Sequence, residues 1–273
     1  MVDCLQGACD LSRAVASFAP LNAHFVALLD ELIAHHDLVG PFLDLGCGSG
    51  YVSAHLARRG WEGVAVDDSA VARTAAVAAL ARYERVAIAD ALPPVGGAPA
   101  FNLLLLFDVL EHVRDDGALL AAAAARQPPD GALVLTVPTN AAREWRWDDD
   151  FYGHVRRYDP AELPNVLRRA GYRTVECWDV SFPVFWAARR LATALRSAPA
   201  MAGSPAERTA ATSNVESAFA GGAAARGLAR FVPWRLLFAL QRPFRARVGW
   251  GNEMMVLARR VRETGPCNPG PIR

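Results

Sequence analysis

The chain of 273 residues contains no lysine, so all 29 of its basic residues are arginines. This absence excludes Schiff-base chemistry and the phosphate-binding P-loop, because both need a lysine amine. The five cysteines are scattered and form no C-x-x-C pair, which argues against a zinc site or a disulfide framework and favours a reducing compartment. A net charge of +1 gives no general attraction for nucleic acid.

The chain also lacks long hydrophobic runs and a recognisable targeting segment. No uninterrupted apolar stretch reaches the roughly 18 residues that a membrane span needs. Asp3 and Asp10 stand where a signal peptide would have a basic region followed by an apolar one. We therefore expect a cytoplasmic protein. A composition of 52% hydrophobic and 21% charged residues suits one α/β domain with an insertion.

Three glycines alternate with other residues directly after an apolar run, in the segment Leu43-Asp44-Leu45-Gly46-Cys47-Gly48-Ser49-Gly50. An apolar strand, a tight glycine turn and a following helix N-terminus together form a site for a nucleotide-like ligand. The dinucleotide fingerprint G-x-G-x-x-G needs a glycine where this chain has Tyr51. The observed pattern, with an acid two residues before the first glycine, resembles the first motif of the class I S-adenosylmethionine-dependent methyltransferases.

Acids follow the next two predicted strands, at 63–67 and 86–89. A carboxylate about 20 residues after the glycines is placed to accept hydrogen bonds from both hydroxyls of a ribose. The resemblance assigns this role to Asp67, with Asp68 as the alternative. It also implies that Asp90 binds the adenine amino group and that the backbone of Ala91 reaches the ring. The competing interpretation is that these acids only cap helices or turns.

The fourth predicted strand, 101–107, runs into Asp108-Val109-Leu110-Glu111-His112-Val113. This segment is similar to the fourth motif of small-molecule methyltransferases such as the quinone-biosynthesis O-methyltransferases. The resemblance implies that backbone at Phe107 and Asp108 holds the methionine end of the cofactor. Methyltransferases acting on DNA bases or on a glutamine amide have an Asn/Asp-Pro-Pro-Tyr/Phe turn here, so nucleic acid is disfavoured as a partner. The predicted cofactor contacts are Asp44, Gly46, Cys47, Gly48, Gly50, Tyr51, Asp67, Asp68, Asp90, Ala91, Phe107, Asp108 and His112.

The segment 139–158 is rich in aromatic and charged residues and has no apolar period, which is typical of a substrate loop. His154 is the first candidate for a general base and His112 the second, because an ordinary imidazole titrates near pH 6.5. An alternative is that 153–158 only holds the loop in place. The candidates for acceptor binding are Trp147, Tyr152, Arg156 and Arg157, although the two arginines could instead pair with the acids at 148–150. No metal is expected.

Strands at 173–181 and 253–259 are expected to close the sheet as an antiparallel pair, with a long insertion between them. Its Ala/Ser/Gly-rich part, 197–226, is expected to be mobile. Across 183–248, ten arginines stand against two glutamates, a local charge of +8. In a helix at 184–196, Leu191 and Leu195 share an apolar face with Val184 and Ala188, opposite the arginines. The first interpretation is a cap over the site with solvated arginines; the second is a basic amphipathic membrane contact.

These observations predict a doubly wound α/β fold, a seven-stranded, mostly parallel sheet with a helical, arginine-rich insertion before the last strand. The predicted units are a core at 1–182, the insertion at 183–251, and the last strand with a tail at 252–273. The resemblance implies a small-molecule methyltransferase using S-adenosylmethionine, with O-methylation of a hydroxyl first and a lipid-linked molecule or a sugar as acceptor. The alternatives are N- or C-methylation and a non-catalytic cofactor-binding subunit. Peripheral membrane contact and the oligomeric state stay open.

Overall fold

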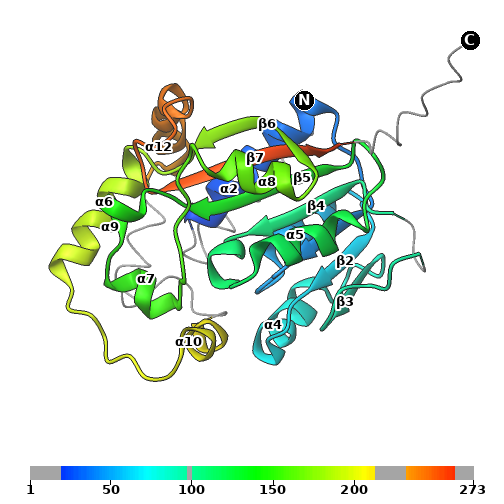
Figure 1. Cartoon of the computed structure of the whole chain (residues 1–273), viewed down its shortest axis with the longest axis horizontal. Helices are drawn as coiled ribbons and strands as arrows, with labels where there is room; N and C mark the ends of the chain where they lie inside the picture. The colour runs from blue at the N-terminus through cyan, green and yellow to red at the C-terminus, as the bar shows by residue number, and fades with distance from the viewer. Residues whose placement is uncertain (1–19, 97–99, 213–231, 262–273) are drawn as a thin grey trace, which may run out of the picture.

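The computed structural model describes residues 20–96, 100–212 and 232–261, so the predictions for residues 1–19 and 213–231 lie outside the described part. A seven-stranded sheet forms its centre, with strand order β3-β2-β1-β4-β5-β7-β6 (Figure 1). Each strand lies within two residues of its predicted bounds. The strands are β1 (Phe42–Leu45), β2 (Gly63–Val66), β3 (Val86–Ala89), β4 (Leu103–Phe107), β5 (Ala132–Pro138), β6 (Tyr172–Asp179) and β7 (Glu253–Arg260).

The first five strands are parallel, and β7 pairs antiparallel with both β5 and β6. Every residue of β1, β4 and β5 is buried, which is why these strands read as continuous apolar runs and not as alternating ones. The predicted fold class is thereby confirmed. From β1 the chain first adds β2 and β3 towards one edge of the sheet. It then returns to the other side of β1 and adds β4 and β5. The carboxyl ends of β1 to β4 therefore meet around the point where doubly wound sheets bind ligands.

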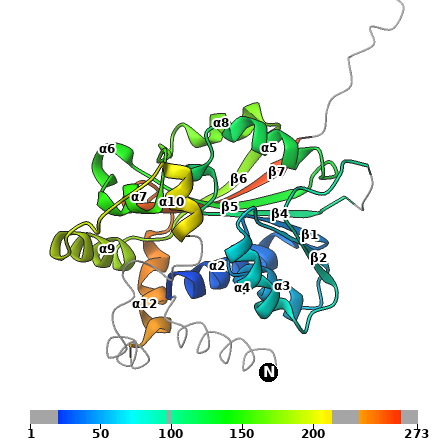
Figure 2. The ribbon, with the colours of Figure 1, turned by 90° about the horizontal axis from the view of Figure 1, so that it is seen from below.

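Helices cover both faces of the sheet (Figure 2). One face packs against α2 (Pro20–His36), α3 (Tyr51–Arg58) and α4 (Ala70–Leu80), whose apolar residues join one core cluster. The other face packs against α5 (Asp116–Ala124) and α8 (Leu163–Arg169), which share a second cluster. The short helix η1 (Leu110–His112) follows β4 directly. None of the described helices combines the length and the apolar character that crossing a bilayer requires.

The remaining helices gather beyond the carboxyl ends of the parallel strands (Figure 1). Two of them, α6 (Ala141–Glu144) and α7 (Trp147–Tyr152), occupy the segment that we expected to be an irregular loop. This expectation was wrong because the backbone N–H of Arg146 is capped by the Asp149 carboxylate at 2.8 Å, which starts a helix. The segment from β6 to β7 contributes α9 (Val184–Leu195), α10 (Pro205–Thr212), α12 (Trp234–Gln241) and η2 (Arg242–Phe244).

Helix α10 lies inside the stretch that we expected to be mobile, and for residues 205–212 that prediction was wrong. The reason is a capping box, a pattern visible in the sequence as Ser204-x-x-Glu207. The Glu207 carboxylate accepts a hydrogen bond from the Ser204 backbone N–H at 2.6 Å. The Ser204 hydroxyl accepts one from the Glu207 N–H at 3.3 Å.

The faces of α9 differ from the prediction. Leu191 and Leu195, expected on the covered face, are 60% and 75% exposed. Arg189 and Arg190, expected in solvent, turn towards α6 and α7 and form ion pairs there. Leaving buried carboxylates at the base of the insertion without a cation costs more free energy than leaving two leucines exposed to solvent. Charge pairing therefore set the orientation of this helix.

The contact between β1 and β2 gives a test of the sheet. A Cβ at Gly63 would lie 2.5 Å from the Phe42 carbonyl oxygen and 2.7 Å from its ring, whereas a Cβ at Gly117 in α5 meets nothing closer than 3.6 Å. We expect Gly63→Ala to lower the free energy of unfolding by about 1–3 kcal/mol through overpacking. Gly117→Ala, the matched control, is expected to leave it unchanged or raise it by up to about 1 kcal/mol. Urea titration followed by circular dichroism measures both, and equal effects would contradict the packing argument.

Candidate functional site

The glycine turn after β1 has a backbone that only glycine adopts easily. Gly46, Gly48 and Gly50 have φ values of +70°, +53° and +75°. A Cβ at Gly46 would lie 2.6 Å from a methyl group of Val109. The turn is tied to β2, because the N–H of Gly48 donates to the Asp67 carboxylate at 2.9 Å. The result is a rigid turn that packs against the segment after β4 and lines a cavity of about 1880 Å³.

Two buried side chains, Asp44 and Cys47, support this turn from below. The Ser53 hydroxyl donates to Asp44 at 2.6 Å, which joins the end of β1 to α3. Burial raises the pKa of Asp44 to about 6, against the opposing hydrogen bonds from Ser53. Burial also raises the pKa of the Cys47 thiol, and the charges of Asp44 and Asp67 act in the same direction. Asp44 and Cys47 line the cavity together with Tyr51, the first residue of α3.

The predicted ribose and adenine contacts line the same cavity. The two Asp67 oxygens accept from the backbone N–H groups of Gly48 and Ser69, each at 2.9 Å. A carboxylate has about four acceptor positions, so two are left for ribose hydroxyls. Asp68 is exposed, and so are Asp90 and Ala91 after β3. These placements fit an adenosyl group along the ends of β1, β2 and β3, and the individual roles stay predictions.

The residues after β4 form the middle of the site. Asp108 has a φ of +54°, unusual for a residue with a side chain, and accepts a hydrogen bond from the Thr136 hydroxyl at 2.6 Å. Burial raises its pKa, which hydrogen bonds to Thr136 and Glu253 and the charge of His154 partly offset. Phe107 and Asp108 both line the cavity beside Gly46. The strained backbone thus brings the Asp108 carboxyl group and the glycine turn to the same place.

Two buried glutamates belong to the site and were not predicted. Glu111 in η1 and Glu253 at the start of β7 line the cavity, and each has a buried carboxyl oxygen without a hydrogen-bond partner. Burial, followed by the charge of Asp108, raises the pKa of both well above its usual range. Glu253 lies opposite Pro138 in the antiparallel pair of β5 and β7. The available signal was an acid directly before the apolar run 254–258.

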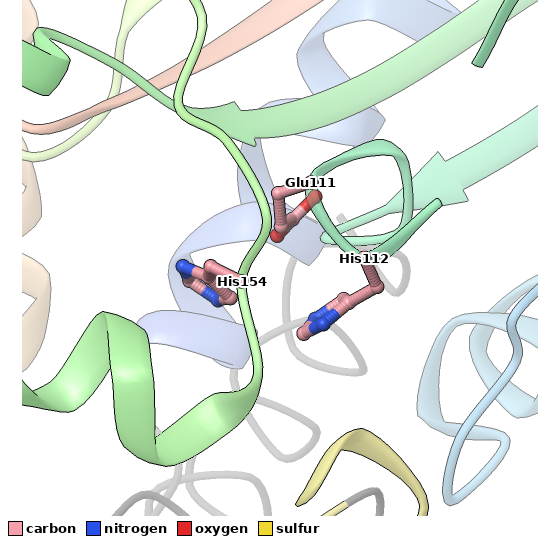
Figure 3. Close-up of side chains that lie close together, drawn as sticks. All are labelled: Glu111, His112 and His154. Carbon is pink, nitrogen blue, oxygen red and sulfur yellow. The ribbon is translucent and has the colours of Figure 1, made fainter. Parts of the chain in front are cut away.

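His112 and His154 lie close to Glu111 (Figure 3). Glu111 and His112 belong to η1, whereas His154 lies on the segment that follows α7. The two imidazole rings meet edge to face, with centroids 4.8 Å apart and an interplanar angle of 75°. His154 Nδ1 lies 2.8 Å from an oxygen of Asp149, whose side chain is 1% exposed. A carboxylate held on Nδ1 orients the ring and leaves Nε2 for a second task, as in hydrolytic triads.

His112 is held differently. Its Nδ1 lies 3.0 Å from the Thr209 hydroxyl of α10, and it has a second hydrogen bond with the backbone at Gly153. Burial, followed by the charge of His154, lowers its pKa to about 3, so the ring is neutral at pH 7. Donor atoms of Glu111, His112 and His154 lie within 4.8 Å of one another, and Nδ1 of each histidine already has a hydrogen-bond partner. The cluster suits proton transfer, and metal independence stays a prediction.

The remaining predicted site residues are engaged within the protein. Arg157 donates to Asp149 at 2.7 Å and to the Thr139 carbonyl at 2.7 Å, and Arg156 pairs with Asp116 at 2.7 Å. Pairing therefore describes both arginines better than binding of an anionic acceptor, although Arg156 uses a different acid from those predicted. The Trp147 indole N–H donates to the Thr193 carbonyl of α9, and Tyr152 lines the cavity.

Part of the cavity wall is apolar, and we call this part the apolar branch. Its walls come from α2, α9 and α12, three helices that are far apart in the sequence. The lining residues there include Ala23, Val26, Val184, Phe185, Trp234 and Leu237. The site thus combines a polar edge on the sheet with an apolar extension between helices, an arrangement typical of pockets for organic ligands.

A family model described as a methyltransferase domain matches residues 18–177. The chain is 32% identical over 142 residues to ribosomal RNA small subunit methyltransferase C of Alcanivorax borkumensis, covering 48% of this chain and 42% of that protein. It is 37% identical over 98 residues to the ubiquinone biosynthesis O-methyltransferase of Caulobacter sp., covering 34% and 38%. It is 32% identical over 153 residues to the ubiquinone biosynthesis O-methyltransferase of Rhodopseudomonas palustris, covering 50% of this chain and 58% of that protein. The chain spans about half the length of these relatives.

Solved structures agree on the fold. The 1,6-didemethyltoxoflavin-N1-methyltransferase of Burkholderia thailandensis, with S-adenosylhomocysteine bound, has a TM-score of 0.51 at 18% identity and covers 92% of this chain and 82% of its own. The [4+2]-cyclase SpnF has a TM-score of 0.52 at 20% identity, with 86% and 80% covered. Since one architecture appears with a methyltransferase and with a cyclase, activity has to be argued from the site.

The neighbouring acids after β2 give a paired test of the cofactor edge. We expect Asp67→Ala to weaken binding of S-adenosylhomocysteine by at least about tenfold, because even one hydrogen bond to a charged group contributes about 1.5–3 kcal/mol. Asp68→Ala removes the same charge from an exposed position and is expected to change affinity less than about threefold. Isothermal titration calorimetry measures both. A larger loss for Asp68→Ala would transfer the ribose contact to that residue.

Proposed function

The chain belongs to the methyltransferase-domain family, as a class I S-adenosylmethionine-dependent enzyme, and from that premise we propose that it methylates a hydroxyl group of a small molecule. The observation that carries the proposal is His154, which lines the cavity together with the predicted cofactor contacts and is held at Nδ1 by the buried Asp149. A hydroxyl loses its proton during methylation, and an imidazole oriented by a carboxylate is suited to accept it. A merely cofactor-binding subunit would have no need for such a pair.

The bound cofactor supplies an electrophilic methyl group on its sulfonium. The protein would align and shield the reactants: the glycine turn and Asp67 would hold the adenosyl part, while Phe107 and Asp108 would hold the methionine end. His154 takes the acceptor proton on Nε2, and Asp149 stabilises the imidazolium that results. Residues of α9 and α10 line the cavity, and we expect these helices to limit the access of water to the acceptor oxygen.

The comparisons support oxygen as the acceptor atom. Two of the relatives described above are named as ubiquinone biosynthesis O-methyltransferases. The relative named as a ribosomal RNA methyltransferase matches at a similar identity. We nevertheless propose a small molecule and no nucleic acid, because the turn after β4 reads Phe107-Asp108-Val109-Leu110 and the cavity continues into an apolar branch. N- or C-methylation of a small metabolite is the alternative, and the cell compartment we propose is the cytoplasm.

The cavity favours a lipid-linked acceptor over a sugar. Its volume of about 1880 Å³ exceeds the roughly 300–1,000 Å³ of ordinary small-molecule pockets, so room remains beside a bound cofactor. The branch between α2, α9 and α12 is apolar and suits a hydrocarbon chain, whereas a sugar would leave its hydroxyls unpaired there. We therefore propose that the reacting hydroxyl lies near His154 and an attached apolar group lies in this branch.

The units at 1–182, 183–251 and 252–273 fit this proposal, with the insertion as a cap that also touches a membrane surface. Among its described residues, the exposed large apolar side chains are Leu191, Leu195, Met201, Leu236, Leu240 and Trp250. Four of its arginines already have acidic partners within the protein, Arg189, Arg190, Arg242 and Arg245. We therefore expect burial of these apolar side chains in the bilayer to contribute more to membrane binding than attraction between arginines and anionic lipid does.

Replacing the proposed base gives the test of the reaction. We expect His154→Ala to lower kcat by about 10²- to 10⁴-fold, the usual contribution of a positioned general base, with binding of S-adenosylhomocysteine within about twofold of wild type. His35→Ala, at the exposed end of α2, is the control and is expected to change neither. The assay measures methyl transfer to hydroxylated aromatic acceptors with and without an attached alkyl chain. Unchanged turnover by His154→Ala would remove this residue as the base.

Co-sedimentation with vesicles tests the membrane contact. We expect the double variant Leu191→Ser/Leu195→Ser to weaken binding to vesicles of anionic phospholipid at least about tenfold, because burying one leucine contributes about 1.5–3 kcal/mol. Val71→Ser/Val77→Ser on α4 changes two similarly exposed valines, 62% and 55%, away from the insertion and serves as control. Equal pelleting of both variants and wild type would reduce the insertion to a cap.

A further inference from the structure

The base His154 is positioned by a carboxylate that has several partners. Asp149 accepts from His154 Nδ1 at 2.8 Å and from Arg157 Nε at 2.7 Å on the same oxygen. Its other oxygen accepts from the Arg146 backbone N–H at 2.8 Å and from Arg189 Nη2 at 2.8 Å. The side chains of Asp149 and Arg157 are 1% and 2% exposed, so solvent hardly screens these contacts.

Arg189 is the partner that comes from the insertion. It forms a bidentate pair with Asp148 through Nε and Nη2, both at 2.7 Å, and donates to the Glu144 carbonyl through Nη1 at 3.0 Å. Five planar donors on one guanidinium make such a multiple contact possible, and lysine could not reproduce it. One side chain of α9 thereby fixes both α6 and α7, including the carboxylate that orients the base.

A second contact from the insertion reaches the other histidine. The Thr209 hydroxyl of α10 lies 3.0 Å from His112 Nδ1 and 3.2 Å from the Tyr152 carbonyl oxygen. Helix α10 also packs on Gly153, where a Cβ would lie 2.2 Å from the Pro205 carbonyl oxygen. Because the ring of His112 meets that of His154 edge to face, α10 supports the proposed base through His112, by contacts separate from those of α9.

We propose that the insertion completes the acid–base site, with Arg189 as the positioning residue that acts on His154 through Asp149 and Thr209 as the one that acts on His112. This inference rests on the proposed role of His154. It implies that the sheet alone can bind the cofactor, whereas methyl transfer needs the docked insertion. Several titratable or charged groups face His154 and set its proton affinity together: Asp149, Tyr152, Arg157, His112, Glu111 and Asp108.

The test compares two neighbouring arginines of α9. Arg189→Gln removes the charge beside Asp149, and we expect it to lower kcat/KM by about tenfold, part of the roughly 10²- to 10⁴-fold that a positioned base supplies. Without this cation Asp149 attracts the imidazolium more strongly, so the acidic limb of the pH profile moves to higher pH. Arg190→Gln is the matched control, because Arg190 pairs with Glu144 at 2.6 Å. Both variants are expected to bind S-adenosylhomocysteine like wild type.

A measurement independent of turnover separates this inference from the proposed function. Ring NMR signals of His154, assigned with His154→Gln, are followed against pH in the full chain with S-adenosylhomocysteine. The inference requires the titration midpoint of His154 to rise in Arg189→Gln and to stay unchanged in Arg190→Gln. If that shift occurs and no acceptor is methylated, the positioning holds and the proposed reaction fails. If wild type is active and both variants titrate alike, the inference is overturned.

A conservative variant covers the case in which Arg189→Gln does not fold. Arg189→Lys keeps the charge and loses the fork, so we expect the midpoint of the pH profile to stay near that of wild type while kcat falls. Thr209→Val removes the hydroxyl on His112 with little change in volume, and Thr212→Val makes the same change one turn along α10. A fall in kcat for Thr209→Val and not for Thr212→Val is expected. Equal kcat values in these two would overturn the role of α10.

Discussion

The proposed acceptor side of this protein depends on one buried carboxylate, that of Asp149. Its partners belong to three separate parts of the chain: the first turn of α7, the segment with His154 and Arg157, and Arg189 of α9. Burial alone would raise its pKa, but the hydrogen bond to His154 and the charges of Arg157 and Arg189 prevail and lower it to about 2. An ionised group in this position is stable only with all its partners in place. It therefore links the insertion to His154, the proposed base.

The cofactor side is built on a different principle. It uses the ends of parallel strands, which the topology brings together without help from the insertion. The glycine turn, Asp67 and the strained Asp108 all depend on contacts between β1, β2, β4 and β5. A donor site formed by local geometry and an acceptor site formed by distant contacts can vary separately. This separation is consistent with one fold appearing with different activities.

What the sequence could predict follows from this division. The strands, the turn of Gly46 to Gly50 and the acids after the strands are local patterns, and the structure places them together. Glu253 could not be placed, because only the register of β7 against β5 brings it to the site. Arg189 was expected in solvent, because the periodicity of one helix gives no information about acidic residues that another helix places beside it. Helix α10 was the avoidable error, because its capping box was readable in the sequence.

The position of Cys47 has a chemical consequence. This thiol lies in the middle of the glycine turn, is 4% exposed, and has its pKa raised by burial and by the acids around it. Sulfur attacks electrophiles and peroxides as thiolate, and this side chain stays protonated. We therefore expect the turn to resist oxidants and alkylating agents although its central side chain is a cysteine.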